Sequence, residues 1–205
     1  MTPIRRVEGR ACPLGLDNVD TDQLCPARFM KRRRAEGYGD AFLHALRVGE
    51  DGTPQQNSID RHAGAVILLA GRNFGAGSSR EAAVYATLDA GFRVVVASSF
   101  GDIFAANAAR NGLLPARVEA ELVTLILEET RSDPSRTVHV DLETLTLQAG
   151  DITAEFHVEP SRREMLLNGW DDLDVTAQHA DAIARFQAED ARRRPWAQRV
   201  EEPRK

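Results

Sequence analysis

The stretch Gly75-Ala76-Gly77-Ser78-Ser79-Arg80-Glu81 separates two segments of different character, and it decides the fold. The run before it, residues 65–70, is rich in leucine and β-branched residues and predicts a buried strand. The alanine-rich segment after it predicts a helix over residues 79–90. A strand, a glycine-rich turn and a helix in this order indicate a βαβ unit of an α/β protein.

The same turn has the chemistry of an anion site. Two glycines let the backbone approach a ligand closely or adopt positive φ. Two serines and an arginine follow where the helix begins, so hydroxyls, a guanidinium and free backbone N–H groups surround one small volume. The stretch lacks the third glycine of a dinucleotide fingerprint and the Gly-Lys-Ser/Thr ending of a P-loop. It therefore indicates a carboxylate or phosphate site and not a standard nucleotide loop.

A purely structural role for the serines is the alternative. Ser78 and Glu81 have the spacing of a capping box, and serine at a helix start is usually a cap. Arg80 argues against a cap alone, because a cation in the first turn is opposed by the partial positive charge of the helix N-terminus. We expect either a bound anion there or neutralisation of Arg80 by Glu81 and an acid from elsewhere in the chain.

The alternation of strand and helix continues on the carboxyl side of the turn. Residues 93–97 predict a second strand and residues 101–111 a second helix, with Gly91 and Gly112 at the expected helix ends. Such alternation implies crossover connections and a parallel core sheet.

Further elements are expected on both sides of this core. A helix is predicted over residues 40–47, and another over 119–129 with Leu122, Leu125 and Ile126 on one face. An antiparallel meander and two closing helices are predicted at residues 137–142, 144–148, 152–158, 161–168 and 177–191.

Length and composition suit one domain that buries its core without disulfides or metals. The chain has 205 residues, of which 42% are hydrophobic and 28% charged, which is ordinary for a globular protein. We expect residues 1–190 to form this domain and residues 191–205 to form a mobile charged tail.

Charge and cysteine content exclude several classes of function. The net charge of −5 argues against general nucleic-acid binding. The apolar runs are too short to span a bilayer, and residues 1–9 lack the apolar core of a signal peptide. Two cysteines without a Cys-x-x-Cys motif cannot hold an iron–sulfur cluster alone, and the five histidines are too scattered for a metal pattern. We expect a cytoplasmic chain that binds no metal itself.

Five motifs in order resemble the small subunit of bacterial 3-isopropylmalate dehydratase, which corresponds to the swivelling domain of aconitase. The likeness runs from about residue 5 to residue 190 and implies an α/β fold, the aconitase-type swivelling β/β/α domain. The motifs are Asn-Val-Asp-Thr-Asp-Gln (18–23), Pro-Ala-Arg-Phe (26–29), Asn-Phe-Gly-Ala-Gly-Ser-Ser-Arg-Glu (73–81), Ser-Phe-Gly-Asp-Ile-Phe (99–104) and Asn-Gly-Leu-Leu-Pro (111–115).

The resemblance implies a reaction and a partner. Enzymes of this family isomerise 2-isopropylmalate to 3-isopropylmalate in leucine biosynthesis, by removing water and adding it back the other way round. A separate large subunit carries a 4Fe-4S cluster whose open iron is a Lewis acid for the departing hydroxyl. The chain is thus expected to act on a small dicarboxylate as a hydro-lyase, only together with that large subunit, and to bind no cofactor itself.

The resemblance also implies roles for residues of the turn. Ser78 would be the general base that takes the proton from the carbon beside a substrate carboxylate. Ser79 and Arg80 would bind a carboxylate, with Arg80 able to do so bidentately. Gly75 and Gly77 would leave room for the substrate and expose backbone N–H groups.

The family also places an acid and a cation from the region of residues 18–29 near the site. Here these are Asp22 and Arg28. The basic residue varies in position within the family, and capping of a loop is the alternative role for Asp22.

Three positions depart from the family pattern and leave the substrate open. Ala76 replaces a frequent cysteine, Ala82 a common histidine, and Cys25 a usual aliphatic residue. The alternatives are a paralogue acting on a methylmalate, a dimethylmalate or a homocitrate-like acid, and a non-catalytic anion-binding module. Gly37-Tyr38-Gly39 resembles the leucine-pathway form, which favours isopropylmalate.

Overall fold

The computed structural model describes residues 1–197 and divides the chain into two units, Met1–Trp170 and Asp171–Lys205. The second unit contains α8 (Asp172–Ala177), α9 (Ala180–Arg193) and the short 3-10 helix η3 (Pro195–Ala197). The expected boundary at residue 190 stays a prediction, and residues 198–205 of the expected tail lie outside the described residues. Within residues 1–197, no helix combines the length and the apolar character that a membrane crossing requires.

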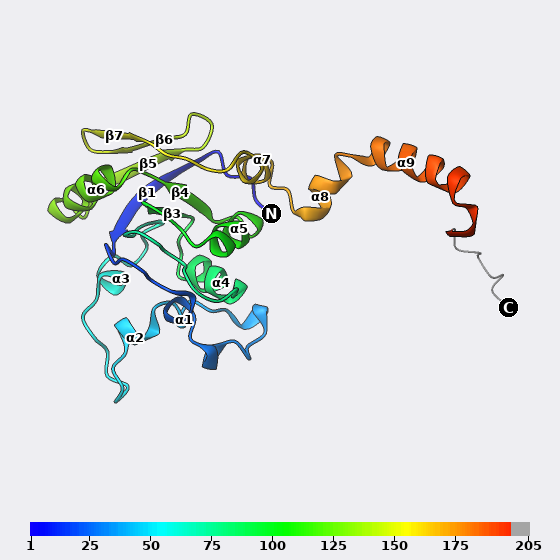
Figure 1. Ribbon diagram of the computed structural model, residues 1–205. Helices are drawn as coiled ribbons and strands as arrows, with labels where there is room; N and C mark the ends of the chain where they lie inside the picture. The colour runs from blue at the N-terminus through cyan, green and yellow to red at the C-terminus, as the bar shows by residue number, and fades with distance from the viewer. Residues whose placement is uncertain (198–205) are drawn as a thin grey trace. The chain divides into compact units, whose positions relative to one another are not determined.

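The first unit is built on one seven-stranded sheet with the order β4-β3-β2-β1-β5-β6-β7 (Figure 1). Four of its strands are mutually parallel, and these are β1 (Arg6–Pro13), β2 (Ile67–Leu69), β3 (Val94–Ala97) and β4 (Leu114–Arg117). The remaining strands form an antiparallel meander, and these are β5 (Thr137–Asp141), β6 (Thr146–Ala149) and β7 (Ile152–Glu155). The predictions of a parallel core and of an antiparallel meander are both confirmed.

β1 joins the two halves of the sheet. Its carboxyl half pairs in parallel with β2, Ala11 opposite Ile67, while its amino half pairs antiparallel with β5, Val7 opposite Val140. Sequence periodicity did not predict this strand, because charged side chains alternate in its exposed first half and Gly9 interrupts it. β4 was not predicted either, since Pro115 lies inside it.

Helices cover both faces of the parallel strands. The longer ones are α4 (Glu81–Asp89), α5 (Asp102–Arg110), α6 (Ala120–Ser132) and α7 (Pro160–Asn168). The short ones are α1 (Thr21–Leu24), α2 (His44–Arg47), α3 (Ser58–Arg61) and the 3-10 helices η1 (Ala27–Phe29) and η2 (Arg34–Glu36). The helix expected over residues 40–47 is thus limited to its last four residues. The glycines expected at helix ends do follow α4 and α5.

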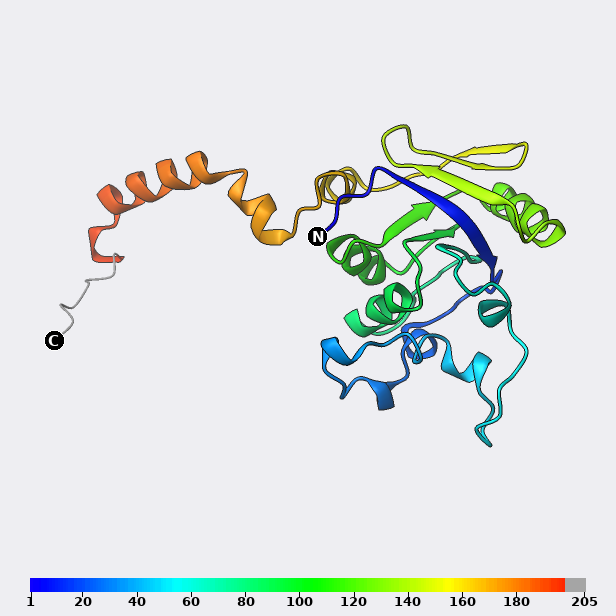
Figure 2. The ribbon, with the colours of Figure 1, turned by 180° about the vertical axis from the view of Figure 1, so that it is seen from behind.

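Side chains of the buried strands alternate between two apolar clusters, as the period of a strand requires. Leu68 and Val95 belong to the cluster that α4 completes with its small residues Ala83 and Ala86. Ile67, Leu69, Val94 and Val96 belong to the cluster on the other face, which α6 and the meander complete. In Figures 1 and 2, α1 and α4 accordingly lie on one side of the parallel strands, with α6 and β5–β7 on the other.

The buried face of α6 differs from the predicted one. Leu125 was placed on the apolar face, yet its side chain is 47% exposed. The buried positions of this helix are Val123, Ile126, Leu127 and Thr130, which follow the i, i+3, i+4, i+7 spacing of one face. Leu122 packs at the edge of that face. Only the sheet decides which of several adjacent leucines faces it.

Two neighbouring positions on α6 test this packing. Replacing Ile126 with Ala deletes a fully buried side chain, and we expect a loss of about 2–5 kcal/mol in the free energy of unfolding. Replacing Leu125 with Ala on the same helix should change it by no more than about 0.5 kcal/mol, because that side chain faces solvent. Urea denaturation followed by circular dichroism measures both, and equal losses would contradict this orientation of the helix.

Candidate active site

Three loops meet at the carboxyl ends of β1, β2 and β3, and each carries one of the sequence motifs. Carboxyl ends of parallel strands lie at one edge of a sheet, which is where such folds place their sites. The Gly75 N–H donates to the Val19 carbonyl at 2.7 Å, and the Phe74 N–H donates to the Ser99 carbonyl at 3.0 Å. The Gly101 N–H donates back to the Phe74 carbonyl at 2.9 Å. The central motif is therefore held on both sides by the other two.

Two asparagines reinforce this junction. Asn18 and Asn73 both have positive φ, 54° and 57°, and the Asn73 side-chain amide donates to Asn18 Oδ1 at 3.0 Å. The Asn73 N–H also donates to Ser99 Oγ at 2.8 Å. Asparagine tolerates the left-handed region better than most residues. Sequence reasoning assigned these residues no role of their own, and their position just before each turn was the only signal.

The two glycines of the turn differ in their surroundings. Gly75 is buried with φ of 73°, and a Cβ there would lie 2.2 Å from Phe104 Cγ. Its N–H is used by Val19, so the expectation that Gly75 exposes this group is wrong. Gly77 is exposed with φ of 92°, and a Cβ there would meet only ordinary contacts, 3.6 Å from Thr21 Oγ1. Substrate contact at either glycine stays a prediction.

Neither serine caps the helix. α4 begins at Glu81, with Arg80 in the N-cap position and no side-chain cap hydrogen bond. Ser78 and Ser79 precede the helix and are exposed. The capping-box interpretation is therefore wrong, because Glu81 Oε1 accepts from the Asn111 side chain at 2.8 Å. Within residues 1–197 no hydrogen bond engages either serine hydroxyl, so both remain available for chemistry.

Arg80 pairs with Asp22, which comes from α1. Of the two expected alternatives, neutralisation by an acid from elsewhere in the chain is the one observed, but Glu81, which was expected to share in it, bonds to Asn111 instead. The Arg80 side chain is only 18% exposed and that of Asp22 is 54% exposed. Arg80 Nη1 lies against Asp22 Oδ1 yet is buried without a properly oriented hydrogen bond. The guanidinium is thus fixed in place with donor capacity left over.

Asp22 is not the loop cap that was the alternative to its functional role, because Asp20 takes that position. Asp20 is the N-cap of α1, and its Oδ1 accepts from the Gln23 N–H at 2.7 Å. The Gln23 side chain accepts from the Asp20 N–H at 2.9 Å, which completes a capping box. Asp22 is thereby left to face Arg80.

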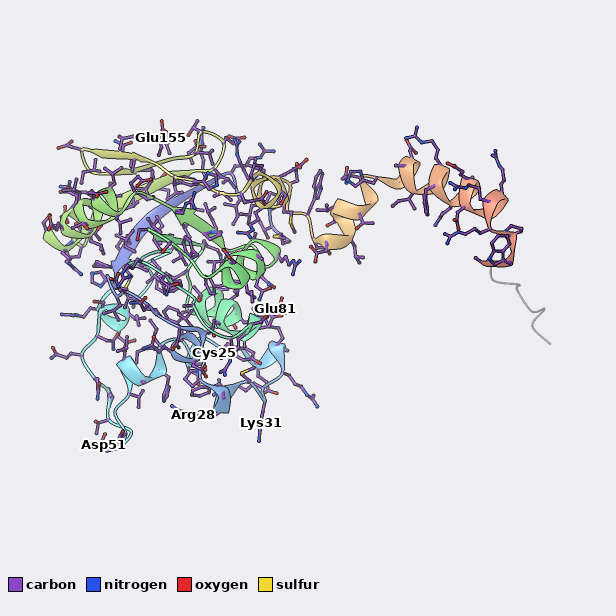
Figure 3. The ribbon with its side chains drawn as sticks, viewed as in Figure 1. Cys25, Arg28, Lys31, Asp51, Glu81 and Glu155 are labelled. Atoms are coloured by element: carbon purple, nitrogen blue, oxygen red, sulfur yellow. The ribbon has the colours of Figure 1, made fainter. Side chains whose placement is uncertain are left out.

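Arg28 lies apart from this pairing. It is exposed on η1, and its guanidinium stacks 4.9 Å from the centre of the Phe29 ring. In the part of the chain that the structure describes, it makes no hydrogen bond or ion pair with residues 75–81. Figure 3 shows Arg28 at the lower edge of the first unit, below Cys25. The structure therefore brings together Asp22, Ser78, Ser79 and Arg80 and leaves Arg28 on the rim.

Cys25 lies beneath the site, at the end of α1, and is fully buried. Burial raises the pKa of its thiol, and the positive charges of Arg80 and Arg32 oppose that shift in part. Cys12, inside β1, is also buried, and the pKa of its thiol rises to about 12. Thiolates are the reactive and metal-binding form of cysteine. Both residues consequently act as small apolar groups in the core.

The comparison with known proteins agrees with these motifs. Residues 1–121 match the family described as the aconitase C-terminal domain. The 3-isopropylmalate dehydratase small subunit of Rubrobacter xylanophilus is 43% identical over 187 residues, which cover 91% of this chain and 94% of that protein. This chain belongs to the 3-isopropylmalate dehydratase small-subunit family. The protein of the same name from Bifidobacterium longum subsp. infantis is 43% identical over 196 residues, covering 96% of this chain and 85% of the relative.

The fold agrees as well. The crystal structure of a 3-isopropylmalate dehydratase protein from Methanocaldococcus jannaschii matches with a TM-score of 0.61 at 22% identity, covering 88% of this chain and 98% of that one. The expected aconitase-type swivelling fold is confirmed. The relatives are named as small subunits, which implies a larger partner subunit. Residues 1–197 of this chain contain no group of three or more His, Cys, Asp or Glu side chains suited to hold a metal ion.

The close approach at Gly75 can be tested against a glycine with open space around it. Gly75→Ala adds a Cβ that collides with Phe104 in a left-handed conformation, and we expect a loss of about 2–5 kcal/mol in the free energy of unfolding. Gly52→Ala has the same sign of φ but no atom within 4 Å of the added Cβ, so it should cost only about 1–2 kcal/mol. Urea titration of both variants gives the difference. Similar losses would show that Phe104 does not constrain the turn.

Proposed function

We propose that this chain is the small subunit of a hydro-lyase that isomerises 2-isopropylmalate to 3-isopropylmalate in leucine biosynthesis. The observation that carries the proposal is the turn in which, within residues 1–197, no hydrogen bond engages the Ser78 hydroxyl and Asp22 pairs with the Arg80 guanidinium two residues further on. The names of relatives at 43% identity supply the substrate. Both free cysteines suit a reducing compartment, so we place the enzyme in the cytoplasm.

Substrate binding begins with charge. The chain is acidic overall, so a dicarboxylate is attracted only by a local positive field. Arg80 binds one substrate carboxylate through the part of its guanidinium that stays exposed beside Asp22, and a planar guanidinium suits a bidentate contact. Ser79 and the exposed backbone at Gly77 add hydrogen bonds, while Gly75 keeps the turn seated on Phe104. Arg28 at the rim strengthens the attraction at longer range.

Ser78 is the general base. In its alkoxide form, Ser78 takes the proton from the carbon beside the bound carboxylate and becomes a neutral hydroxyl, hydroxide leaves the adjacent carbon with the C–O bonding pair, and the unsaturated diacid results. A hydroxyl is a weak base, so the incipient alkoxide must be stabilised, which the backbone N–H groups at the start of α4 and the Arg80 charge do. In rehydration, hydroxide adds to the carbon that lost the proton, and the Ser78 hydroxyl gives its proton to the carbon that lost hydroxide, which restores the alkoxide.

The remaining chemistry is assigned to the partner. A 4Fe-4S cluster on the larger subunit supplies the Lewis acid for hydroxide departure. This chain offers two cysteines, both buried, whereas such a cluster needs several accessible thiolates. The chain alone is therefore expected to be inactive.

The test is turnover by the anaerobically reconstituted pair, this chain with its cognate large subunit. Ultraviolet absorbance of the unsaturated acid follows the reaction with isopropylmalate, methylmalate, dimethylmalate and homocitrate in parallel. We expect preference for isopropylmalate and no turnover by the chain alone. Preference for another diacid would assign a paralogous function, for which Ala76 and Ala82 are the first residues to examine. A pair with an intact cluster but no turnover would favour an anion-binding module.

Ser78→Ala tests the base directly. We expect kcat of the pair to fall by about 10²–10⁴, because general-base catalysis contributes on that order. Assembly with the large subunit, measured by size-exclusion chromatography, should not change, since Ser78 is exposed and engages no other side chain within residues 1–197. Thr153→Val removes an exposed hydroxyl on β7, the far strand of the sheet, and serves as the control with unchanged kcat. Normal turnover by Ser78→Ala would refute the assignment.

A further inference from the structure

One turn of helix, α1, supports the site from beneath at two adjacent positions. Asp22 pairs with Arg80, as described above. Thr21, the residue before it, is only 2% exposed. Its Oγ1 donates to the carbonyl oxygen of Ser78 at 2.9 Å, and its N–H donates to the carbonyl oxygen of Ala76 at 2.9 Å. Thr21 has no role in the reaction steps proposed above.

Among the described residues, the bond from the Thr21 hydroxyl is the one hydrogen bond of the peptide unit between Ser78 and Ser79. Ser78 and Ser79 are exposed and lie outside α4. Among the described residues, the Ser78 carbonyl bonds to Thr21, and the Ser79 N–H has no acceptor. Loop peptides that lack such bonds move more than the elements they connect.

The geometry of a trans peptide extends the effect of this bond to Ser79. The carbonyl of Ser78 and the N–H of Ser79 belong to one planar unit and point in opposite directions. Because the carbonyl points down to Thr21, the Ser79 N–H points away from α1. The same bond fixes the backbone from which the Ser78 side chain extends.

α1 is itself rigidly placed, so it can act as a support. The capping box of Asp20 and Gln23 closes its first turn. Its last residue, Leu24, is fully buried. The carbonyl oxygen of Val19, just before the N-cap of α1, accepts from the Gly75 N–H. Figure 1 shows α1 next to α4, in agreement with the backbone contacts between the two helices.

We propose that Thr21 is a positioning residue, whose buried hydroxyl holds the Ser78–Ser79 peptide so that the Ser79 N–H faces the carboxylate subsite and the Ser78 hydroxyl stays within reach of the substrate proton. α1 thereby positions Ser78 through Thr21 and the Arg80 guanidinium through Asp22. The catalytic consequence rests on the proposed function, whereas the anchoring of the peptide does not. Positioning errors of about 1 Å cost up to about 100-fold in rate, so one such bond is worth detecting kinetically.

The substitution that removes only the bond is Thr21→Val, which keeps the shape of the side chain. Thr21→Ser keeps the hydroxyl and is the rescue variant. Thr87→Val and Thr130→Val are matched controls. Both residues are buried, at 0% and 3% exposure, and each hydroxyl donates to a carbonyl at 2.8 Å, but within its own helix and not to the turn.

The first readout is amide hydrogen exchange on the chain alone, which needs no partner and no activity. Thr21→Val should speed exchange by about tenfold, the effect of losing one hydrogen bond, at the two bonded amides between residues 19–21 and the turn, those of residue 21 and Gly75. Thr21→Ser should stay near the natural protein, and the two control variants should leave these residues unchanged. Unchanged exchange in Thr21→Val would overturn the proposal.

The second readout is kinetic, with the reconstituted pair. Thr21→Val should lower kcat between about tenfold and 100-fold with little change in KM, and Thr21→Ser should restore it. An equal loss in Thr87→Val or Thr130→Val would show a general effect of stability and would refute a positioning role. If the natural pair shows no turnover, the proposed function fails, and the exchange experiment still decides whether Thr21 anchors the turn.

Discussion

The pairing of β1 with two different neighbours is the constraint on which the rest of the structure depends. One strand bonds in parallel to β2 at its carboxyl half and antiparallel to β5 at its amino half. It thereby attaches the meander to the parallel core without a further strand. Its carboxyl end also starts the loop that leads to α1, so the register of β1 against β2 sets where Thr21 and Asp22 meet the turn.

Charge placement at the site solves a local conflict. A guanidinium at the start of a helix is opposed by the partial positive charge there, and Arg80 is mostly buried. Asp22, whose side chain is 54% exposed, offsets that charge. Glu81 is withdrawn from this balance by Asn111. Arg80 is thereby neutralised by Asp22, while its Nη1 makes no properly oriented hydrogen bond.

Sequence patterns predicted those elements whose signal is local. The strands around residues 65–70 and 93–97 are buried on both faces and therefore form continuous apolar runs, and glycines follow the helices after them, α4 and α5. The sequence did not predict β1, because half of this strand faces solvent with charged side chains. It did not predict β4, because Pro115 lies in it. The prediction for Leu125 was wrong because α6 has apolar residues on more than one side, and only contact with the sheet selects the buried ones.

The sequence by itself determined the family, the α/β class and the composition of the turn from Gly75 to Glu81. It also named both members of the Asp22–Arg80 pair, because their residue types and motifs are visible in one dimension. Only the tertiary structure decided that these two side chains meet, that the serines are free of the helix cap, and that Thr21 binds the Ser78 carbonyl across 57 residues. The conformational preference of a short stretch of sequence does not reveal contacts between residues so far apart in the chain. The pairing of β1 with β2 brings these residues together.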